Sequence, residues 1–300
     1  MMQRRGVVVS LTLAPAVFAQ RVRAQPERKV YRIGILSFGS TGSDQTALAT
    51  PDKTISAFVD GMRELGYRYG EHFVMESRGA QGMPERLPGL AAELVRLRPD
   101  AIIAGGGLPA LALKRATSTI PVVMAASVDP VGQGLVQSLA DPGGNITGMS
   151  LQSTETIGKR LELLKELVPG MAPVAVLWYR AEPADWQPAQ AAARARGWTL
   201  LSLEIRNVGE IAAALKTAMG AGAGALLVRD GGLLAYGTSL DALYARMAVY
   251  VDQLFRGKKP AELPVEQPKT FSVVLNLRTA KALGLSIPRS LLLRADEVIQ

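Results

Sequence analysis

Three consecutive glycines follow an apolar run in the first half of the chain and precede a helical pattern. The run covers residues 101–104, Gly105, Gly106 and Gly107 come next, and the helical pattern extends through Lys114. The first backbone N–H groups of a helix have no partner within the helix, and the helix dipole is positive at this end. Such a turn is suited to bind a carboxylate, so these residues indicate the binding of a small anion.

Other candidate residues also lie directly after apolar runs. In an open sheet of parallel strands, ligands bind outside the carboxyl ends of the strands. This rule selects loops in both halves of the chain, where Tyr179 could contact a ligand and Asp230 could pair with an amine. The predicted ligand-binding residues are Ser37, Gly39, Gly106, Gly107, Leu108, Ser127, Asp129, Tyr179 and Asp230.

Each of these candidates also has a purely structural interpretation. Ser37 and Gly39 can form a simple turn, and the three glycines can serve close packing of a helix on a strand. Asp129 precedes a proline and can cap its own turn. Trp178, next to the candidate Tyr179, can be a core residue, and Asp230 can be a hairpin residue only. The sequence leaves these alternatives open.

Side chains for covalent or metal chemistry are scarce. The chain has no cysteine, and its only histidine is His72, which we interpret as a surface residue at the start of a strand. Thiolate metal sites and cysteine nucleophiles are thereby excluded, and histidine clusters and serine–histidine triads are disfavoured. We therefore expect no enzymatic activity, no metal site and no cofactor.

One motif favours a different class of protein. Gly105, Gly107 and Ala110 fit a loose dinucleotide fingerprint, and Asp129 follows at a distance suited to a ribose contact. An NAD-dependent oxidoreductase is the alternative that this spacing indicates. The motif follows the third predicted strand rather than the first, and Pro109 lies inside it, so we favour the binding interpretation.

The basic charge of the chain is concentrated at its N-terminus. The formal net charge is +8, and the first 24 residues contain four arginines and no acid, which leaves +4 for the remainder. No dense Lys/Arg run with interleaved aromatic residues follows. We therefore expect a mildly basic solvated surface and no nucleic-acid binding.

The first 24 residues have the three-part pattern of a secretory signal peptide. A basic segment precedes an apolar stretch at residues 6–18, which is short for a membrane span. Val22 and Ala24 supply the small residues of a cleavage site. We expect cleavage after Ala24 and a periplasmic location, with the Sec and twin-arginine routes both open because of Arg4 and Arg5. The alternative is an apolar helix that stays attached.

Strand and helix patterns alternate along the rest of the chain, which is typical of an α/β fold with open parallel sheets. In the first half, strands are expected at 31–37, 72–77, 101–104 and 121–125, with helices at 53–65, 84–96 and 107–114. In the second half, helices are expected at 153–168, 187–196, 208–219, 239–255 and 279–283, with strands at 174–178, 200–205, 225–228, 233–236 and 271–275.

Several segments resemble the bacterial family of ABC transporter substrate-binding proteins related to the tryptophan/tyrosine binders. The strongest signals are GKKPAELPVEQP at 257–268, NLRTAKALG at 276–284 and IPRSLLLRAD at 287–296. YRIGI at 31–35, GMRELGY at 61–67, LPGLAAEL at 87–94, ATSTIPV at 116–122, DPVG at 129–132 and PGGNITG at 142–148 agree with this family in order.

The resemblance implies two Rossmann-like lobes of the type I periplasmic-binding fold, joined by hinge strands. We expect lobe I at 25–148, completed by about 272–300, and lobe II at 149–271. The implied function is capture of an amino-acid-like or other small carboxylate by a monomer that delivers it to an ABC permease in the inner membrane. The core of a sugar-responsive transcription regulator shares this fold, but the signal-like segment occupies the place of its DNA-binding motif.

The sequence departs from the family pattern in the second lobe. The family has a further helix and strand between the strand ending near Val228 and the segment at 231–237, and this chain lacks them. Two parallel strands need a crossover of about a dozen residues or more. The two strands must therefore be antiparallel, run on as one strand, or lie in different sheets. A degenerate family member that folds but no longer binds a ligand is the alternative that this loss raises.

Overall fold

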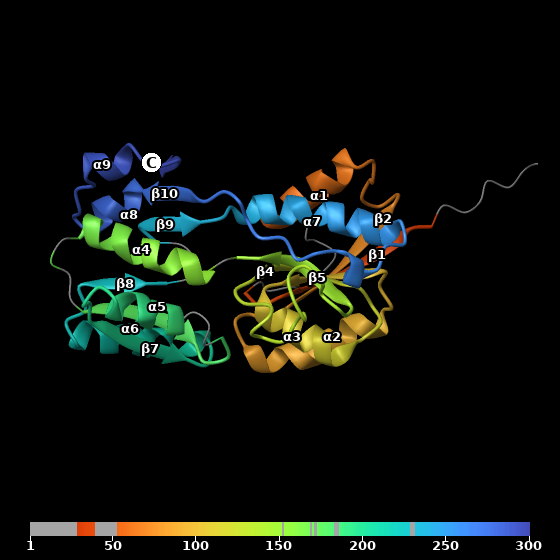
Figure 1. The fold of residues 1–300 in the computed structure, drawn as a ribbon, viewed down its shortest axis with the longest axis horizontal. Helices are drawn as coiled ribbons and strands as arrows, with labels where there is room; N and C mark the ends of the chain where they lie inside the picture. The colour runs from red at the N-terminus through yellow and green to blue at the C-terminus, as the bar shows by residue number, and fades with distance from the viewer. Residues whose placement is uncertain are drawn as a thin grey trace, which may run out of the picture.

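The computed structural model describes residues 29–39, 53–151, 153–168, 170, 173–182, 186–228 and 232–300. The chain forms two lobes that lie side by side along the long axis of the molecule (Figure 1). It passes between the lobes after residue 151, between residues 237 and 240, and between residues 266 and 272. None of the helices in these described ranges is long and apolar enough to cross a membrane.

The first lobe is built on a parallel five-stranded sheet of order β2-β1-β3-β4-β5. Its strands are β1 (Tyr31–Ser37), β2 (Phe73–Gly79), β3 (Ala101–Gly105), β4 (Val122–Ser127) and β5 (Ile146–Ser150). The central strands β3 and β4 are runs of buried apolar and small residues rather than alternating patterns, because helices cover both faces of the sheet. In β3, Ala101 and Ile103 face one hydrophobic cluster and Ile102 and Ala104 face the other.

Four helices among the described residues cover this sheet. The elements are α1 (Lys53–Glu64), α2 (Leu87–Arg96, after the short 3-10 helix at Pro84–Arg86), α3 (Gly107–Ala116) and α7 (Leu240–Phe255). Helices α1 and α7 pack together on one face, and α2 and α3 lie on the other (Figure 1). Gly61 allows the close approach of α1 to α7, because a Cβ atom there would lie 2.8 Å from the carbonyl oxygen of Ala245.

The second lobe contains two separate three-stranded sheets. The first is parallel, with the order β7-β6-β8, and consists of β6 (Val174–Tyr179), β7 (Leu200–Ile205) and β8 (Ala225–Leu227). The second has the order β11-β10-β9 and consists of β9 (Leu234–Gly237), β10 (Ser272–Asn276) and β11 (Glu297–Ile299). Strand β10 is antiparallel to β9 and parallel to β11.

The helices of the second lobe lie around these two sheets. They are α4 (Ser153–Leu167), α5 (Trp186–Arg194), α6 (Ile211–Gly220), α8 (Leu277–Ala282) and α9 (Arg289–Leu292), with 3-10 helices at Val208–Glu210 and, in the connector to β10, at Pro260–Glu262. Helix α4 contacts both halves of the lobe: Leu163 and Leu167 pack beside β10, and Ile157 packs beside β6.

The separation of β8 from β9 decides among the three arrangements that the sequence left open. The two strands belong to different sheets, β8 beside β6 and β9 beside β10. The short connection between Leu227 and Leu234 excludes only a parallel pair, because it cannot supply the crossover, and the pairing of β8 with β6 and of β9 with β10 excludes the other two arrangements. The turn residue Asp230, which we predicted from the sequence, lies outside the described residues.

The structure differs from the expectation that residues 272–300 complete the first lobe. Strand β10 pairs with β9, and Leu275 and Leu291 pack against Leu163 of α4, so this segment belongs to the second lobe. In turn α7, which we had placed in the second lobe, packs on α1 in the first. Helical and strand periodicity shows that a segment has a buried face, but not which core buries it.

The interpretation of His72 as a surface residue is wrong. Its side chain is buried, and Nδ1 accepts a hydrogen bond of 2.9 Å from the backbone N–H of Arg68. The imidazole also meets Tyr67 edge to face, so its role in this lobe is structural.

Candidate ligand-binding cleft between the lobes

The carboxyl ends of the first-lobe strands lie together and face the second lobe. Ser37 at the end of β1 is paired in register with Gly105 at the end of β3, and Ser127 ends β4 next to them. Parallel strands bring their ends to one edge of a sheet, so residues 37, 105 and 127 meet although they are far apart in the sequence. This edge is the first-lobe half of the candidate site.

Helix α3 begins at this edge with a turn that only glycine forms without strain. Gly106 precedes the helix with φ 120° and ψ 178°, and no side chain caps the helix. This region of backbone conformation is essentially restricted to glycine. The first turn presents the N–H groups of Gly107 and Leu108, which the helix itself does not use, at its positive end. The geometry suits a bound carboxylate.

Side chains of the second lobe lie directly opposite this turn. Tyr179, at the end of β6, meets Phe38 of the first lobe edge to face, with 5.1 Å between the ring centroids. A Cβ atom on Gly107 would lie 2.8 Å from Oε1 of Glu182. Glu182 is only 3% exposed, although it lies in a loop. The lobes are therefore closed on each other in this structure.

A second contact between the lobes lies at the other side of this edge. Gly82 follows β2, and a Cβ atom there would collide with the side chain of Val208 in the second lobe. Its φ of 71° is a left-handed conformation that also favours glycine. The absence of a side chain at this position lets the lobes approach.

Two further side chains complete the first-lobe half. Gln133 accepts a hydrogen bond of 2.9 Å at Oε1 from the buried Ser127 hydroxyl, and the same oxygen lies 2.8 Å from the Cβ position of Gly107. Tyr244 of α7 places its hydroxyl 3.1 Å from the Cβ position of Gly105. The site therefore draws on the ends of β1, β3 and β4, on α7 and on the loop after β6.

The structure brings most of the predicted site residues to this cleft. Ser37, Gly106, Gly107, Ser127 and Tyr179 lie at the facing ends of strands or at the start of α3. Their assignment as ligand-binding residues remains a prediction. The neighbouring Trp178 stacks on Trp186 and donates a hydrogen bond to the hydroxyl of Ser202, as its core interpretation expects.

The remaining predicted residues have different surroundings. The Leu108 side chain is buried in the hydrophobic cluster between the sheet, α2 and α3, so only its backbone can serve a ligand. Gly39 is exposed, with no atom within 4 Å of its Cβ position. The Asp129 carboxylate accepts a 2.8 Å hydrogen bond from the N–H of Gly132 within its own turn. No position is described for Asp230.

Sequence reasoning missed Phe38, Gln133, Glu182 and Tyr244. Glu182 follows a second-lobe strand by three residues, as a site residue would, and that signal was available. Tyr244 lies within a helix, and no sequence pattern distinguishes it from a core residue. The parts of the chain that the structure describes hold no group of three or more His, Asp and Glu side chains arranged for a metal ion.

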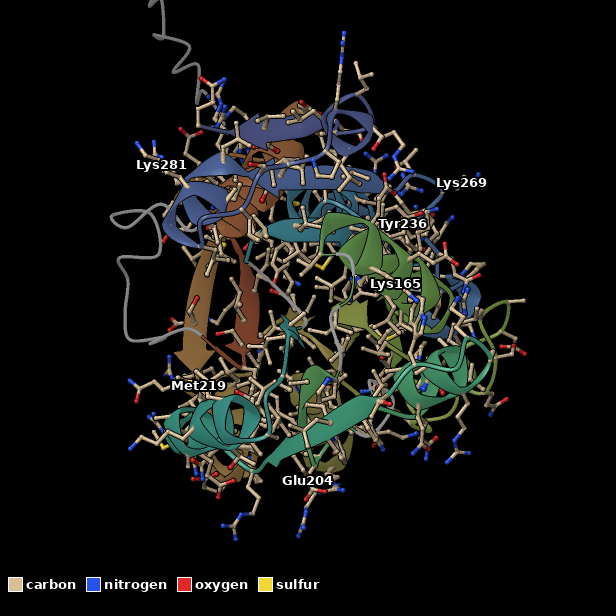
Figure 2. All side chains as sticks on the ribbon, turned by 90° about the vertical axis from the view of Figure 1, so that its left-hand side faces the viewer. Lys165, Glu204, Met219, Tyr236, Lys269 and Lys281 are labelled. Carbon is tan, nitrogen blue, oxygen red and sulfur yellow. The ribbon has the colours of Figure 1, made fainter. Side chains whose placement is uncertain are left out.

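A cavity of about 270 Å³ lies in the second lobe, where its two sheets face each other. Residues of β8 and β9, both edge strands, line it together with Arg160, Leu164 and Leu167 of α4. The Arg160 Nε–H donates a 2.7 Å hydrogen bond to the carbonyl oxygen of Tyr236 in β9. Figure 2 shows α4, which carries Lys165, beside the strand of Tyr236. Val128, next to Ser127, also lines the cavity, so it extends toward the cleft.

Two α/β lobes whose strand ends face each other are typical of periplasmic binding proteins, and comparison with known proteins gives the family. Residues 49–230 and 223–299 match the family model described as ABC transporter substrate binding protein, and the chain belongs to this family. The two matched stretches overlap at residues 223–230, where β8 ends and the expected departure from the family pattern lies.

A curated relative is the tyrosine-binding protein of Clostridioides difficile, strain R20291. It is 34% identical over 131 residues, which make up 44% of this chain and 37% of that protein. The aligned region thus spans little more than a third of the relative's length.

Solved structures with the same fold agree with the class. A conserved domain protein of Vibrio cholerae and an ABC domain of Streptococcus pneumoniae in complex with L-Trp each have a TM-score of 0.78 and 25% identity, covering 90% of this chain and 100% of theirs. A ligand-free, open substrate-binding protein from Clostridium difficile has a TM-score of 0.60 at 22% identity, with the same coverage. The predicted fold class and family are confirmed.

Proposed function

We propose that this chain captures a small amino-acid-like carboxylate between its lobes and delivers it to the permease of an ABC importer. The main support for this proposal is that the first turn of α3 lies opposite the loop after β6. Gly107 lies against Glu182, and Phe38 lies against Tyr179. Closure of two lobes around hinge segments is the common route by which binding proteins bury a ligand.

The cleft offers separate surfaces for the two ends of such a ligand. The N–H groups of Gly107 and Leu108 suit a carboxylate, because hydrogen bonds to an ionised group are about twice as strong as neutral ones. The rings of Phe38 and Tyr179, 5.1 Å apart, offer an apolar surface at the same edge. The names of the C. difficile relative and the S. pneumoniae complex, which refer to tyrosine and L-Trp, support a ligand of the aromatic amino-acid type.

Location and partner follow from the same proposal. Family members act outside the cytoplasm, and residues 1–24 have the pattern of a cleaved export signal. The proposed periplasmic protein would present its closed form to the permease. We propose no catalytic step, because a binding protein of this class needs only to close and reopen.

A thermal-shift screen tests the proposal. Residues 25–300 are unfolded by heating with each of the twenty amino acids and with plain carboxylates such as acetate, propionate and phenylpropionate. A ligand at one hundred times its Kd stabilises the folded state by about 2.7 kcal/mol, which raises Tm by roughly 5–10 °C in a protein of this size. At least one amino acid should produce such a rise and also bind by calorimetry in the micromolar range, about −8 kcal/mol.

The screen also decides between this function and the degenerate-member alternative. That alternative rests on the second lobe, whose sheet is split into two parts around a cavity. No Tm rise with any amino acid or carboxylate would contradict capture and favour a protein that folds without binding. A Tm rise with NAD, together with enzymatic turnover of NAD, would instead favour the oxidoreductase alternative.

A further inference from the structure

The second-lobe cavity between β8 and β9 has a wall of mostly aliphatic side chains. Leucine and valine residues of α4, β8, β9 and β10 supply much of this wall, including Leu164, Leu167, Leu227, Leu234 and Val274. Its volume of about 270 Å³ compares with about 150 Å³ for an apolar protein cavity that binds benzene. The cavity therefore has room for a molecule of roughly ten non-hydrogen atoms.

The two strands beside the cavity are edge strands. Among the described strands, β8 pairs only with β6, and β9 pairs only with β10. Alternate residues of an antiparallel strand direct their backbone groups toward the partner strand and away from it. The N–H of Asn276 bonds to the carbonyl oxygen of Leu233, so the backbone groups of the next residue, Leu234, point away from β10. The wall thus combines an apolar surface with backbone hydrogen-bonding groups at the edge of β9.

The charged side chains of the wall do not favour an ionised ligand. The Nε–H of Arg160 already donates a hydrogen bond to the carbonyl oxygen of Tyr236. Glu297 of β11 also lines the cavity, but it is exposed, so water and salt screen its charge. An ion that leaves water for a leucine-lined space needs a buried counter-charge. The cavity is therefore suited to a neutral, largely apolar molecule.

We propose that this cavity is a second ligand site, which takes a neutral, largely apolar molecule of about ten non-hydrogen atoms with one hydroxyl or similar group. The apolar body contacts Leu164, Leu167 and Val274, and the hydroxyl bonds to the backbone of Leu234 at the edge of β9. The ligand enters beside Leu226, which lines the cavity and is 38% exposed. The glycines at the start of α3 do not line this cavity, so the site is independent of the proposed capture between the lobes.

The test measures the binding of two neutral probes, 1-octanol and 1-naphthol, by calorimetry. Octanoate, which has the same chain as 1-octanol with an ionised end, is the charged comparison.

Two variants block the site and a third is the control. Leu164→Phe places a ring in the cavity, and Leu226→Trp narrows its entrance. Leu283→Phe adds the same ring at a residue of the second lobe that is 60% exposed and does not line the cavity. It lies two residues after Lys281, which Figure 2 labels on the opposite side of the lobe from Tyr236. Thermal unfolding verifies that each variant is folded.

One molecule of each neutral probe should bind saturably to the wild-type protein, and octanoate should bind about 10-fold more weakly than 1-octanol or worse. Leu164→Phe and Leu226→Trp should each weaken the binding of the neutral probes by about 10-fold or more, because less space remains for them. Leu283→Phe should leave their affinity unchanged.

Three results would overturn the inference. The first is that neither neutral probe binds saturably to the wild-type protein. The second is full affinity in every blocking variant that folds, which would place the probes elsewhere on the protein. The third is that octanoate binds as tightly as 1-octanol. All three leave the proposed capture of an amino acid between the lobes untouched, because that ligand is bound at the α3 turn.

Discussion

At the start of α3, two neighbouring glycines are required for different reasons. Gly106 has a backbone conformation that other residues rarely adopt, although 3.9 Å separates its Cβ position from the nearest atom, in Pro109. Gly107 is the first residue of the helix, and its Cβ position lies 2.8 Å from side-chain oxygens of Gln133 and Glu182. The first glycine therefore serves folding, and the second serves contact between the lobes.

Alanine at each position separates the two roles. Gly106→Ala should lower the free energy of unfolding by about 1–3 kcal/mol. Alanine must either adopt a backbone conformation that is strained for it or shift the start of α3. Gly107→Ala should change stability little, since the ends of two flexible side chains can move away, but it should weaken amino-acid binding by displacing Glu182. Urea unfolding and calorimetry measure the two effects. Equal losses of stability in both variants would contradict this division.

The sequence predicted the backbone part of the candidate site and did not predict most of the side chains that the structure places beside it. Small residues at the ends of strands have a visible signature, so Ser37, Gly106, Gly107 and Ser127 were identified correctly as lying at one edge. Glu182 and Tyr244 reach the same edge from other elements. Which side chains meet across a cleft depends on how two lobes are oriented, and no local pattern records that orientation.

Among the elements, α4 has two neighbouring leucines in different surroundings. Leu163 is 2% exposed and packs in the cluster with Val273, Leu275 and Leu291. Leu164 lines the cavity between the two sheets of the second lobe. The helix therefore has one side chain in a filled core and the next beside empty space, because consecutive helical residues point in directions about 100° apart.

Phenylalanine at each leucine tests this description of the second lobe. Leu163→Phe should lower the free energy of unfolding by about 1–3 kcal/mol through overpacking. Leu164→Phe should leave it unchanged or raise it by about 1 kcal/mol, because the larger ring enters the cavity. Chemical denaturation of the two variants side by side gives the comparison. A comparable loss in Leu164→Phe would show that the cavity is filled in solution.

The connector that precedes β10 is held by an ion pair with α7. Arg246 donates two hydrogen bonds to Glu266, of 2.8 and 2.6 Å, and the backbone of Glu266 bonds to Gly148 and Ser150 of the β5 strand. The hydrogen bond from Arg246 lowers the pKa of the Glu266 carboxyl below its usual value. The pair is partly exposed, so its contribution is modest and sensitive to salt.

The lowered pKa determines the sign of a pH effect. A carboxyl whose pKa is depressed in the folded state stabilises the protein above its unfolded pKa, about 4.3 for Glu, and this stabilisation is lost as the pH falls through the folded pKa. The Tm of wild-type protein should exceed that of Glu266→Gln at pH 6, and the difference should shrink below about pH 4. Glu71→Gln, which changes an exposed carboxylate in a surface turn, is the control. A difference that grows on acidification would refute this assignment.

Element types were more predictable than their partners. The alternation of strands and helices gave the α/β class, and the short link after β8 correctly indicated an altered second lobe. The assignment of α7 and of residues 272–300 to their lobes was wrong, because the chain crosses between the lobes repeatedly and hydrophobic periodicity is the same in either core. The short strand β11 also had no detectable pattern.

At the scale of the whole molecule, the proposed ligand capture depends on how the two lobes contact each other. Phe38 with Tyr179, Gly107 with Glu182 and Gly82 with Val208 are all contacts across the cleft. A ligand cannot reach the α3 turn while these contacts persist, so the lobes must open before binding and close after it. Ligand binding should therefore change the population of closed molecules, in proportion to the difference in affinity between the two states.

A distance measurement between the lobes is the most direct test of capture by closure. The chain has no cysteine, so Arg115→Cys in α3 and Met219→Cys in α6 can carry a fluorescent donor and acceptor without other changes. Both positions are exposed, and both helices lie on the lower side of the molecule in Figure 1. Titration with L-tyrosine or L-tryptophan should shorten the inter-dye distance in a saturable manner in the micromolar range, and D-glucose should not. An inter-dye distance that no amino acid changes at saturating concentration would contradict capture of an amino acid by closure of the lobes.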